Sequence, residues 1–358
     1  MAEPKLFTPF TLRGVTIPNR IVVAPMCQYS ADDGLGTDWH IQNIGAKAMG
    51  GPGLVMLEAT HVSAPGRITQ GCLGLWTDEQ QTFVARLARL IEYGGAVPGI
   101  QVSHAGRKAS SKRPWEGGTA LLPKDGGWVP DAVSAISFHD DGVTPHAMSV
   151  EDLRGIVEGF AATVRRAREA GFKVVEIHAA HGYLLHSALS PVSNQRNDGY
   201  GGDLRGRARL LMEVLDAARA EWPEDLPLFV RVSATDYVAG GLTVEDTVEL
   251  ARWLKARGDV DLIDCSSGGI APHVRIPSIH PGYQVPFSEA VRRGAGIATG
   301  AVGMIRTPEL AEEIVANDRA DLVFLARALL ADPAWPLRAA VALGAEVRLV
   351  PQYARAVV

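Results

Sequence analysis

The chain has 358 residues, and its composition is that of a folded globular protein. Hydrophobic residues make up 47% and charged residues 21%, which excludes a disordered, a collagen-like and a disulfide-scaffold chain. Lys and Arg number 35 against 40 Asp and Glu, a net charge of -5. No basic excess therefore points to nucleic acid or to an acidic membrane surface as a partner.

Cysteine usage and hydropathy give the expected compartment. Cys27, Cys72 and Cys265 are odd in number and form no C-x-x-C pair, so we expect neither a disulfide framework nor a structural zinc site. No apolar run reaches about 18 residues, and the first residues lack the pattern of a secretory signal. We expect a cytoplasmic protein that does not contact a membrane.

Short apolar runs rich in β-branched residues alternate with longer helical patterns, which is typical of parallel strands joined by helical crossovers. Eight strands are predicted, the number that closes a (β/α)8 TIM barrel. Their ranges are Arg20 to Ala24, Gly53 to Thr60, Ala96 to Ser103, Lys173 to Ala179, Pro227 to Ser233, Asp261 to Ser266, Gly296 to Ala301 and Asp321 to Ala326. We expect a single domain, residues 1–358.

Helices are predicted between these strands. Their ranges are Trp39 to Met49, Asp78 to Tyr93, Val150 to Ala170, Leu204 to Trp222, Val244 to Arg257, Pro286 to Arg293, Pro308 to Asn317 and Pro333 to Leu343. Thr77, Ser149, Thr243 and Thr307 are expected N-caps, and Gly94 and Gly171 are expected left-handed C-caps. The Gly- and Pro-rich segment 105–148 after the third strand is predicted to form a lid over the site, as a loop or a β-hairpin.

Polar side chains gather where the predicted strands end, which is the active-site face of such barrels. After the fourth strand come His178, His181 and Tyr183. The two histidines could ligate a metal, although that needs a third ligand. They could instead donate hydrogen bonds to a substrate oxygen while Tyr183 supplies a proton, or all three could be structural. Spacing alone leaves these alternatives open.

The ends of three other strands add further candidates. Gly300 and Gly303 after the seventh strand and Arg327 after the eighth occupy the usual phosphate site of these barrels. Arg231 ends a buried strand, where a cation needs either an anionic ligand or an ion-pair partner. Cys27 could be a small buried hydrophobe or a thiol that tunes a redox centre.

Several long motifs, in order along essentially the whole chain, resemble the Old Yellow Enzyme family of FMN-dependent ene-reductases, most closely its thermophilic-like class. The motifs are Pro18 to Ser30 (PNRIVVAPMCQYS), His104 to Lys108 (HAGRK), His178 to His186 (HAAHGYLLH) and Ser190 to Gly202 (SPVSNQRNDGYGG). The resemblance implies a tightly bound FMN and NADPH or NADH as reductant.

The resemblance also implies roles for individual residues. Expected cofactor-binding residues are Ala24, Pro25, Met26, Cys27, Ala59, Gln101, Arg231, Gly303, Ala326 and Arg327, with the Cys27 thiol modulating the flavin potential. Expected substrate-binding residues are Tyr29, Lys108, His178, His181, Tyr183 and Arg355. His178, His181, Tyr183 and Cys27 are the expected catalytic residues, and no metal is expected.

The activity implied is reduction of the C=C bond of an activated alkene, an α,β-unsaturated carbonyl or a nitroalkene. Hydride would come from flavin N5 and a proton from Tyr183. Relatives with an iron-sulfur domain need clustered cysteines, which this chain lacks. From another class, a metal-dependent hydrolase or lyase using His178 and His181 is the alternative.

The C-terminal segment 350–358 resembles an element of this class that reaches into the site of a neighbouring subunit. It contains Tyr353 and Arg355, so we expect a homodimer or a homotetramer. Ala326 stands where the family usually has glycine, which narrows the backbone room at the phosphate site.

Overall fold

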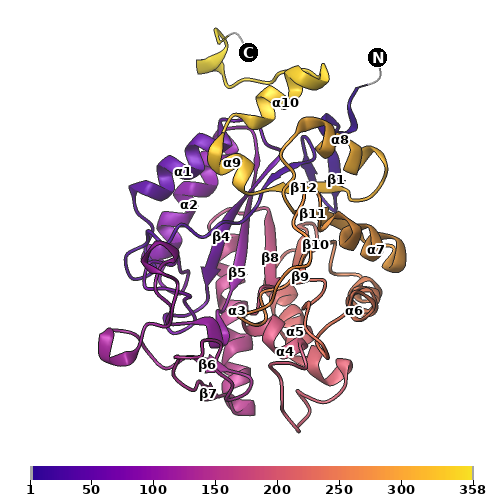
Figure 1. The fold of residues 1–358 in the computed structure, drawn as a ribbon. Helices are drawn as coiled ribbons and strands as arrows, with labels where there is room; N and C mark the ends of the chain where they lie inside the picture. The colour runs from indigo at the N-terminus through magenta and orange to yellow at the C-terminus, as the bar shows by residue number, and fades with distance from the viewer. Residues whose placement is uncertain (1–2, 357–358) are drawn as a thin grey trace.

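A computed structural model, which describes residues 3–356, shows eight parallel strands closed into one barrel (Figure 1). Each strand pairs with the next along the chain, and β12 pairs with β3 to close the circle. The strands are β3 (Ile21–Val23), β4 (Leu54–His61), β5 (Val97–Ser103), β8 (Val174–Ala179), β9 (Leu228–Ser233), β10 (Leu262–Ser266), β11 (Ala298–Ala301) and β12 (Leu322–Leu325). The expected (β/α)8 fold is confirmed.

Helices surround the barrel. They are α1 (Asp38–Ala48), α2 (Asp78–Tyr93), α3 (Val150–Glu169), α5 (Leu204–Glu221), α6 (Val244–Arg257), α7 (Val285–Ala295), α8 (Pro308–Ala316) and α10 (Trp335–Leu343), with the short α4 (Leu184–Leu189) and α9 (Arg327–Ala331) directly after β8 and β12. Thr77, Ser149, Thr243 and Thr307 each accept a backbone N–H of the first turn, as predicted.

One predicted cap is wrong by a residue. Gly94 has a right-handed φ of -72°, and the left-handed residue after α2 is Gly95 at +84°. Either glycine can adopt that conformation without a Cβ penalty, so the sequence alone could not choose between them. Gly171, at φ +95°, is left-handed as expected.

The N-terminal mouth of the barrel is closed by a hairpin of β1 (Phe10–Leu12) and β2 (Val15–Ile17). Ile17 packs in one buried cluster with Val22, Leu54 and Phe229 from the barrel. Both chain ends lie at this side of the molecule, at the top of Figure 1. A ligand can therefore enter the barrel only from the opposite, C-terminal end.

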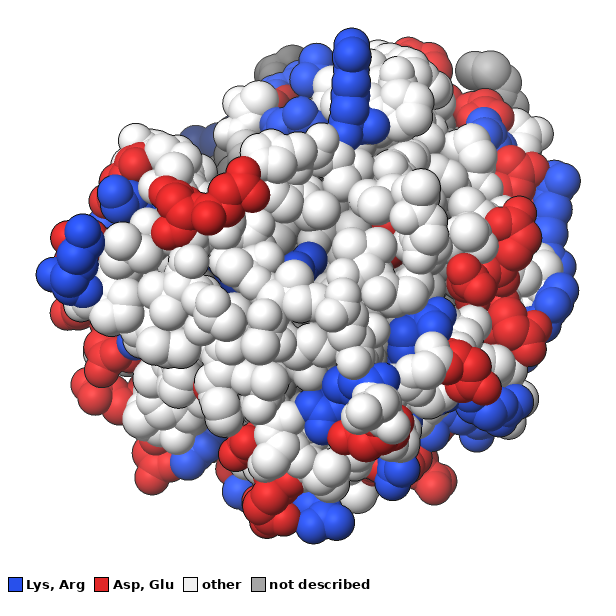
Figure 2. All heavy atoms as spheres, turned by 60° about the horizontal axis from the view of Figure 1, so that its bottom comes forward, with Lys and Arg blue, Asp and Glu red and all other residues white. Residues whose placement is uncertain are grey.

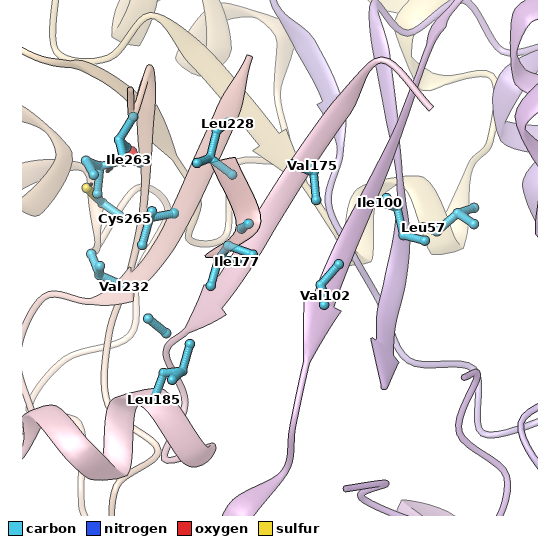
Figure 3. Packing of buried hydrophobic residues seen from close by; sticks show 14 of the residues in the cluster. Leu57, Ile100, Val102, Val175, Ile177, Leu185, Leu228, Val232, Ile263 and Cys265 are labelled. Atoms are coloured by element: carbon cyan, nitrogen blue, oxygen red, sulfur yellow. Dashed lines mark hydrogen bonds between the residues drawn. The ribbon is translucent and has the colours of Figure 1, made fainter. Parts of the chain in front are cut away.

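Period-two alternation along the strands sorts the side chains between two environments. Val175, Ile177, Val232 and Ile263 belong to the large cluster that packs between the strands and the helices (Figure 3). The residues between them point into the barrel, where they change from apolar near the hairpin to polar near the C-terminal ends. The barrel is thus a packed core with a polar floor beneath its open end.

Segment 105–148 packs on the C-terminal side of the barrel, at the bottom of Figure 1. It contains three 3-10 turns and two short strands, β6 (Asp131–Ala132) and β7 (His146–Ala147). These strands pair in parallel and so form no hairpin, and the antiparallel pairing in the segment is a single bridge between Ser111 and Ala120. Trp128 anchors the segment by donating its Nε1–H to Pro65 O.

Within residues 3–356, no helix has the length and apolar character needed to cross a membrane.

Core packing on α3 gives a stability prediction. Phe160 is fully buried between α3 and the barrel, whereas Glu158 on the same helix is exposed. We expect Phe160→Ala to lower the free energy of unfolding by about 3–5 kcal/mol, because a cavity replaces the ring. Glu158→Ala should change it by less than about 0.5 kcal/mol. Urea unfolding at fixed excess FMN measures both, and equal values would contradict the packing described here.

Candidate active site

A cavity of about 500 Å³ lies between segment 105–148 and the loop that joins β10 to α7. It is lined by residues 117–119 and 138–139 of the segment and by residues 268, 269, 271, 272, 274 and 276 of the loop. Figure 2 shows this face: uncharged residues surround a hollow with a basic side chain in it, and charged residues gather toward the rim. The hollow leads to the C-terminal ends of the strands.

Two imidazoles lie side by side at the end of β8. His178 Nδ1 accepts the Ala180 N–H at 3.2 Å, which places the His178 proton on Nε2. Nε2 of His178 lies 3.3 Å from Nδ1 of His181, whose Nε2 is 2.7 Å from Ser266 Oγ. Burial lowers the pKa of both histidines well below the ordinary value. Both rings are therefore neutral, and each carries one N–H.

Tyr183 stands beside this pair. Its ring is 4.9 Å from that of His178 in an edge-to-face arrangement, and burial raises the pKa of its phenol well above the ordinary value. Tyr183, Cys27 and Tyr29 all pack against the same small apolar cluster around Cys72 and Ala105. Burial likewise raises the pKa of the Cys27 thiol. The phenol and the thiol thus keep their protons at neutral pH.

Lys108 contributes a cation at the edge of the site. Its Nζ donates to the carbonyls of His181 (2.9 Å) and Gly269 (3.3 Å). It also lies 5.1 Å from the centre of the Tyr183 ring and 4.4 Å from that of Phe138. Burial, with a smaller contribution from neighbouring Arg107, lowers the pKa of Lys108 to about 8. Lys108 therefore ties segment 105–148 to the turn that carries the histidine and the tyrosine.

Ionisable side chains form the floor of the site. Arg231 Nε lies 2.8 Å from Oδ2 of Asp264 on the adjacent strand, so the arginine has the ion-pair partner that sequence reasoning allowed. Glu176 Oε1 accepts a hydrogen bond from Gln101 Nε2 at 2.7 Å. Burial and the nearby Asp264 raise the pKa of Glu176, outweighing Arg231 and Gln101. Sequence reasoning missed Asp264, although alternation from Leu262 would have pointed it inward.

The residues expected to bind a flavin phosphate meet around a small cavity of about 70 Å³ at the ends of β11 and β12. Gly303, Ala326 and Arg327 all line it. Gly303 has φ +126°, which favours glycine, and a Cβ there would lie 3.1 Å from Gln284. Ala326 has a negative φ of -104°, so this position does not need the left-handed conformation that favours glycine. Arg327 is exposed and has no ion-pair partner within residues 3–356. This cradle fits a phosphate group.

The remaining residues expected to contact a flavin lie at or near the C-terminal ends of β3 and β4. Ala24 and Ala59 are buried at the ends of β3 and β4, and Pro25 and Met26 follow β3 half-buried. Glu58, the residue before Ala59, forms a bulge in β4, and its Oε2 accepts the Gln28 N–H at 2.9 Å. Sequence reasoning gave Glu58 no role. The carboxylate holds the backbone directly after Cys27.

A metal site at the histidine pair would need a third protein ligand. Among residues 3–356, no three His, Cys, Asp or Glu side chains gather in a way that could hold a metal ion. The nearest partner of His181 beyond His178 is the Ser266 hydroxyl, a weak ligand. The side chains thus favour hydrogen bonding over ligation.

Arg355 lies apart from the site of its own chain. The tail is held at the end of α2 by a hydrogen bond between Gln352 Nε2 and the Tyr93 hydroxyl. That end of α2 faces the N-terminal mouth of the barrel, and residues 351–356 are exposed there. The last two residues of the segment expected to reach a neighbour, Val357 and Val358, lie outside the described part, as do Met1 and Ala2.

A barrel with a phosphate cradle after its last two strands, a buried cation in its floor and neutral hydrogen-bond donors above is the arrangement of a flavin-dependent oxidoreductase. The model of the NADH:flavin oxidoreductase / NADH oxidase family matches residues 5–346. The chain belongs to this family, and its resemblance to the Old Yellow Enzymes is confirmed. The protein is therefore an enzyme, and FMN is its cofactor.

Relatives and solved structures agree with this assignment. The chain is 48% identical to an NADPH dehydrogenase of Listeria innocua, over 98% of this chain and 99% of that one. It is 49% identical to an NADPH dehydrogenase of a Geobacillus species, over 99% and 98% of the two chains. Morphinone reductase superposes with a TM-score of 0.78 at 26% identity, covering 97% of this chain and 91% of that one.

A larger relative shares the same barrel. A 2-naphthoyl-CoA reductase superposes with a TM-score of 0.84 at 27% identity, covering 95% of this chain but 52% of that chain. The chain therefore matches about half of that protein.

The buried Glu176 gives a pH-dependent prediction. Its raised pKa means that the folded state binds more protons than the unfolded state, so its contribution to stability falls as pH rises above the ordinary glutamate range. Glu176→Gln keeps an oxygen that accepts the hydrogen bond from Gln101 and removes the carboxyl group whose titration lowers the stability. We expect the variant and the wild type to have the same free energy of unfolding at pH 5. At pH 8 the variant should have the higher value, and the difference should grow by up to about 1.4 kcal/mol per pH unit.

The measurement is urea unfolding of the holoenzyme at pH 5, 6.5 and 8 with fixed excess FMN. Glu158→Gln, on the exposed face of α3, controls for removal of one carboxylate. A stability difference between the Glu176 variant and the wild type that stays constant with pH would contradict the raised pKa.

Proposed function

We propose that this enzyme uses NADPH to reduce the C=C bond of activated alkenes, α,β-unsaturated carbonyls and nitroalkenes. The observation that carries the proposal is the neutral pair His178 and His181 with the protonated Tyr183 ring 4.9 Å away. The names of the 48% and 49% identical relatives support NADPH as the reductant. Morphinone reductase, by its name, supports a reduction of this kind.

The histidine pair binds the electron-withdrawing oxygen of the substrate. Each ring would offer one N–H, His178 from Nε2 and His181 from Nδ1 with the Ser266 hydroxyl donating to its Nε2. Burial keeps both rings neutral before the substrate arrives. Negative charge builds on that oxygen as the alkene is reduced, so hydrogen bonds to it strengthen in the transition state. Because the rings are already held by Ala180 and Ser266, little reorganisation is needed.

Tyr183 protonates the carbon next to the activating group. A general acid must hold its proton until the carbon becomes basic, and burial keeps this phenol protonated. Tyr29 and Lys108 border the same pocket. They would contact the substrate at the edge of this pocket.

The flavin supplies hydride acceptance from the nicotinamide and hydride donation to the alkene. Gly303, Ala326 and Arg327 would hold its phosphate, and Ala24, Pro25, Met26, Ala59 and Gln101 would line its ring site. Arg231 supplies positive charge at the floor, which stabilises negative charge on a reduced ring. Cys27, held as a neutral thiol, would tune the reduction potential of the bound flavin.

We further propose that the enzyme acts in the cytoplasm as a homodimer or homotetramer in which Arg355 completes the site of a neighbour. The exposed tail, fixed at the end of α2 away from its own site, supports this arrangement.

An absorbance experiment tests the proposed activity. The purified protein should show flavin bands that bleach on anaerobic addition of NADPH and return on addition of 2-cyclohexen-1-one. Bleaching without return would refute the alkene substrate while leaving the NADPH reaction intact. A protein that neither shows flavin bands nor takes up FMN would contradict the cofactor site.

The proton-donor role has its own test. We expect Tyr183→Phe to leave flavin reduction by NADPH unchanged and to slow alkene reduction about 10²- to 10⁴-fold, the usual contribution of a general acid. Tyr200→Phe is the matched control, because the Tyr200 hydroxyl donates to Glu213 outside the site. Stopped-flow absorbance resolves the two half-reactions, and an unslowed alkene step would remove Tyr183 from this role.

A further inference from the structure

His186 is a buried histidine that the proposed reaction does not use. It lies in α4, three residues after Tyr183, and is 0% exposed. Gly182 donates its N–H to Nδ1 of His186 at 2.7 Å, and Nε2 lies 2.9 Å from Oδ1 of Asp236. Since Nδ1 accepts, the proton is on Nε2, the atom that lies next to the carboxylate. His186 therefore connects a buried anion to the backbone between His181 and Tyr183.

Asp236 is a fixed anchor in the loop after β9. Its Oδ2 accepts the Ser190 hydroxyl at 2.6 Å and the Leu242 N–H at 2.7 Å. Burial alone would raise the pKa of Asp236, but hydrogen bonds from His186, Ser190 and Leu242 outweigh it and lower the pKa. Oδ2 is fixed by these two donors, and Oδ1 lies 2.9 Å from Nε2 of His186, where its negative charge favours the tautomer with the proton on Nε2.

The turn 181–183, whose Gly182 N–H donates to His186, has an unusual backbone. His181 and Gly182 both have left-handed φ, at +59° and +76°. A non-glycine residue adopts that conformation only where its surroundings hold it. Ser233 Oγ accepts the His181 N–H, and Lys108 Nζ donates to the His181 carbonyl. Within residues 3–356, His186 is the hydrogen-bond acceptor of the Gly182 N–H.

We propose that His186, oriented by Asp236, is a positioning residue that holds the 181–183 turn so that His181 and Tyr183 face the same substrate. The inference rests on the proposed function, which gives those two side chains their roles. His186 acts through the backbone and touches no substrate itself. Small displacements of reacting groups are costly, so losing the Gly182 contact should slow the reaction without altering the flavin site.

Side-chain shape separates this role from a merely structural one. Asparagine places its Oδ1 close to the position of a histidine Nδ1, so His186→Asn can still accept the Gly182 N–H while losing Asp236. Glutamine reaches further and can still donate to Asp236 while losing Gly182. His186→Leu loses both. If His186 positions the turn, the Asn variant should keep faster reoxidation and tighter phenol binding than the Gln variant. If His186 instead anchors the loop after β9, the Gln variant should keep more of both.

The experiment compares these holoenzyme variants with Trp222→Phe. Trp222 donates a buried hydrogen bond to Pro227 O at the other end of the barrel, so this control loses a similar contact away from the turn. Three quantities are measured: the rate of reoxidation by 2-cyclohexen-1-one, the affinity for 4-cyanophenol followed by the flavin spectrum, and hydrogen exchange of the Gly182 amide. The phenol resembles an enolate oxygen and needs no turnover.

We expect His186→Gln and His186→Leu to reoxidise about 10- to 100-fold more slowly, to bind the phenol more weakly and to exchange the Gly182 amide faster. His186→Asn and Trp222→Phe should stay near the wild type in all three. A Gln variant that equals or exceeds the Asn variant overturns the proposal. If the Leu variant does not fold, the Asn and Gln pair decides.

A wild type that is not reoxidised by the enone would refute the proposed function. The phenol affinities and the Gly182 exchange rates would then still decide the role of His186, because neither depends on alkene turnover.

Discussion

A guanidinium inside a protein needs an anion close by, and Arg231 has one in Asp264, 2.8 Å away on the next strand of the barrel. Both side chains must point inward from the same layer for that contact to form. The register that allows it also places His178 opposite Arg231 on the other neighbouring strand. The buried pair thus depends on the same strand alignment that builds the catalytic end of the site.

Neutral groups dominate the site above this charged floor. Burial holds the imidazoles, the phenol and the Cys27 thiol uncharged. Such a site binds neutral substrates without a large desolvation cost and still offers fixed dipoles to charge that develops later. The positive charge in the floor suits a cofactor that gains negative charge. The neutral walls suit a substrate on which negative charge develops only briefly.

The same barrel carries reductases of different size and substrate. Morphinone reductase matches almost the whole chain, whereas the 2-naphthoyl-CoA reductase is about twice as long. A shared barrel does not fix the substrate. In this protein segment 105–148 and the loop between β10 and α7 both line the cavity at the open end, and we expect these loops to set the substrate range.

Sequence alone was sufficient for the barrel, the family and the residues at the strand ends, because strand periodicity and contiguous motifs are local properties. The N-caps followed from single residues. Sequence reasoning was wrong at Gly94, because the neighbouring Gly95 can adopt the same left-handed φ, and the β-hairpin that it offered for segment 105–148 is not formed, because the short strands there pair in parallel.

Contacts between distant segments were decided by the tertiary structure. Asp264 meeting Arg231, Glu58 holding Gln28 and Asp236 orienting His186 join residues about 30 to 50 positions apart. The residue types did not identify which partner each side chain has, since each has several possible partners. The sequence therefore determined which chemical groups reach the open end of the barrel. Only the folded chain determined their partners, their tautomers and their protonation, because those depend on burial and on neighbours brought together by closure.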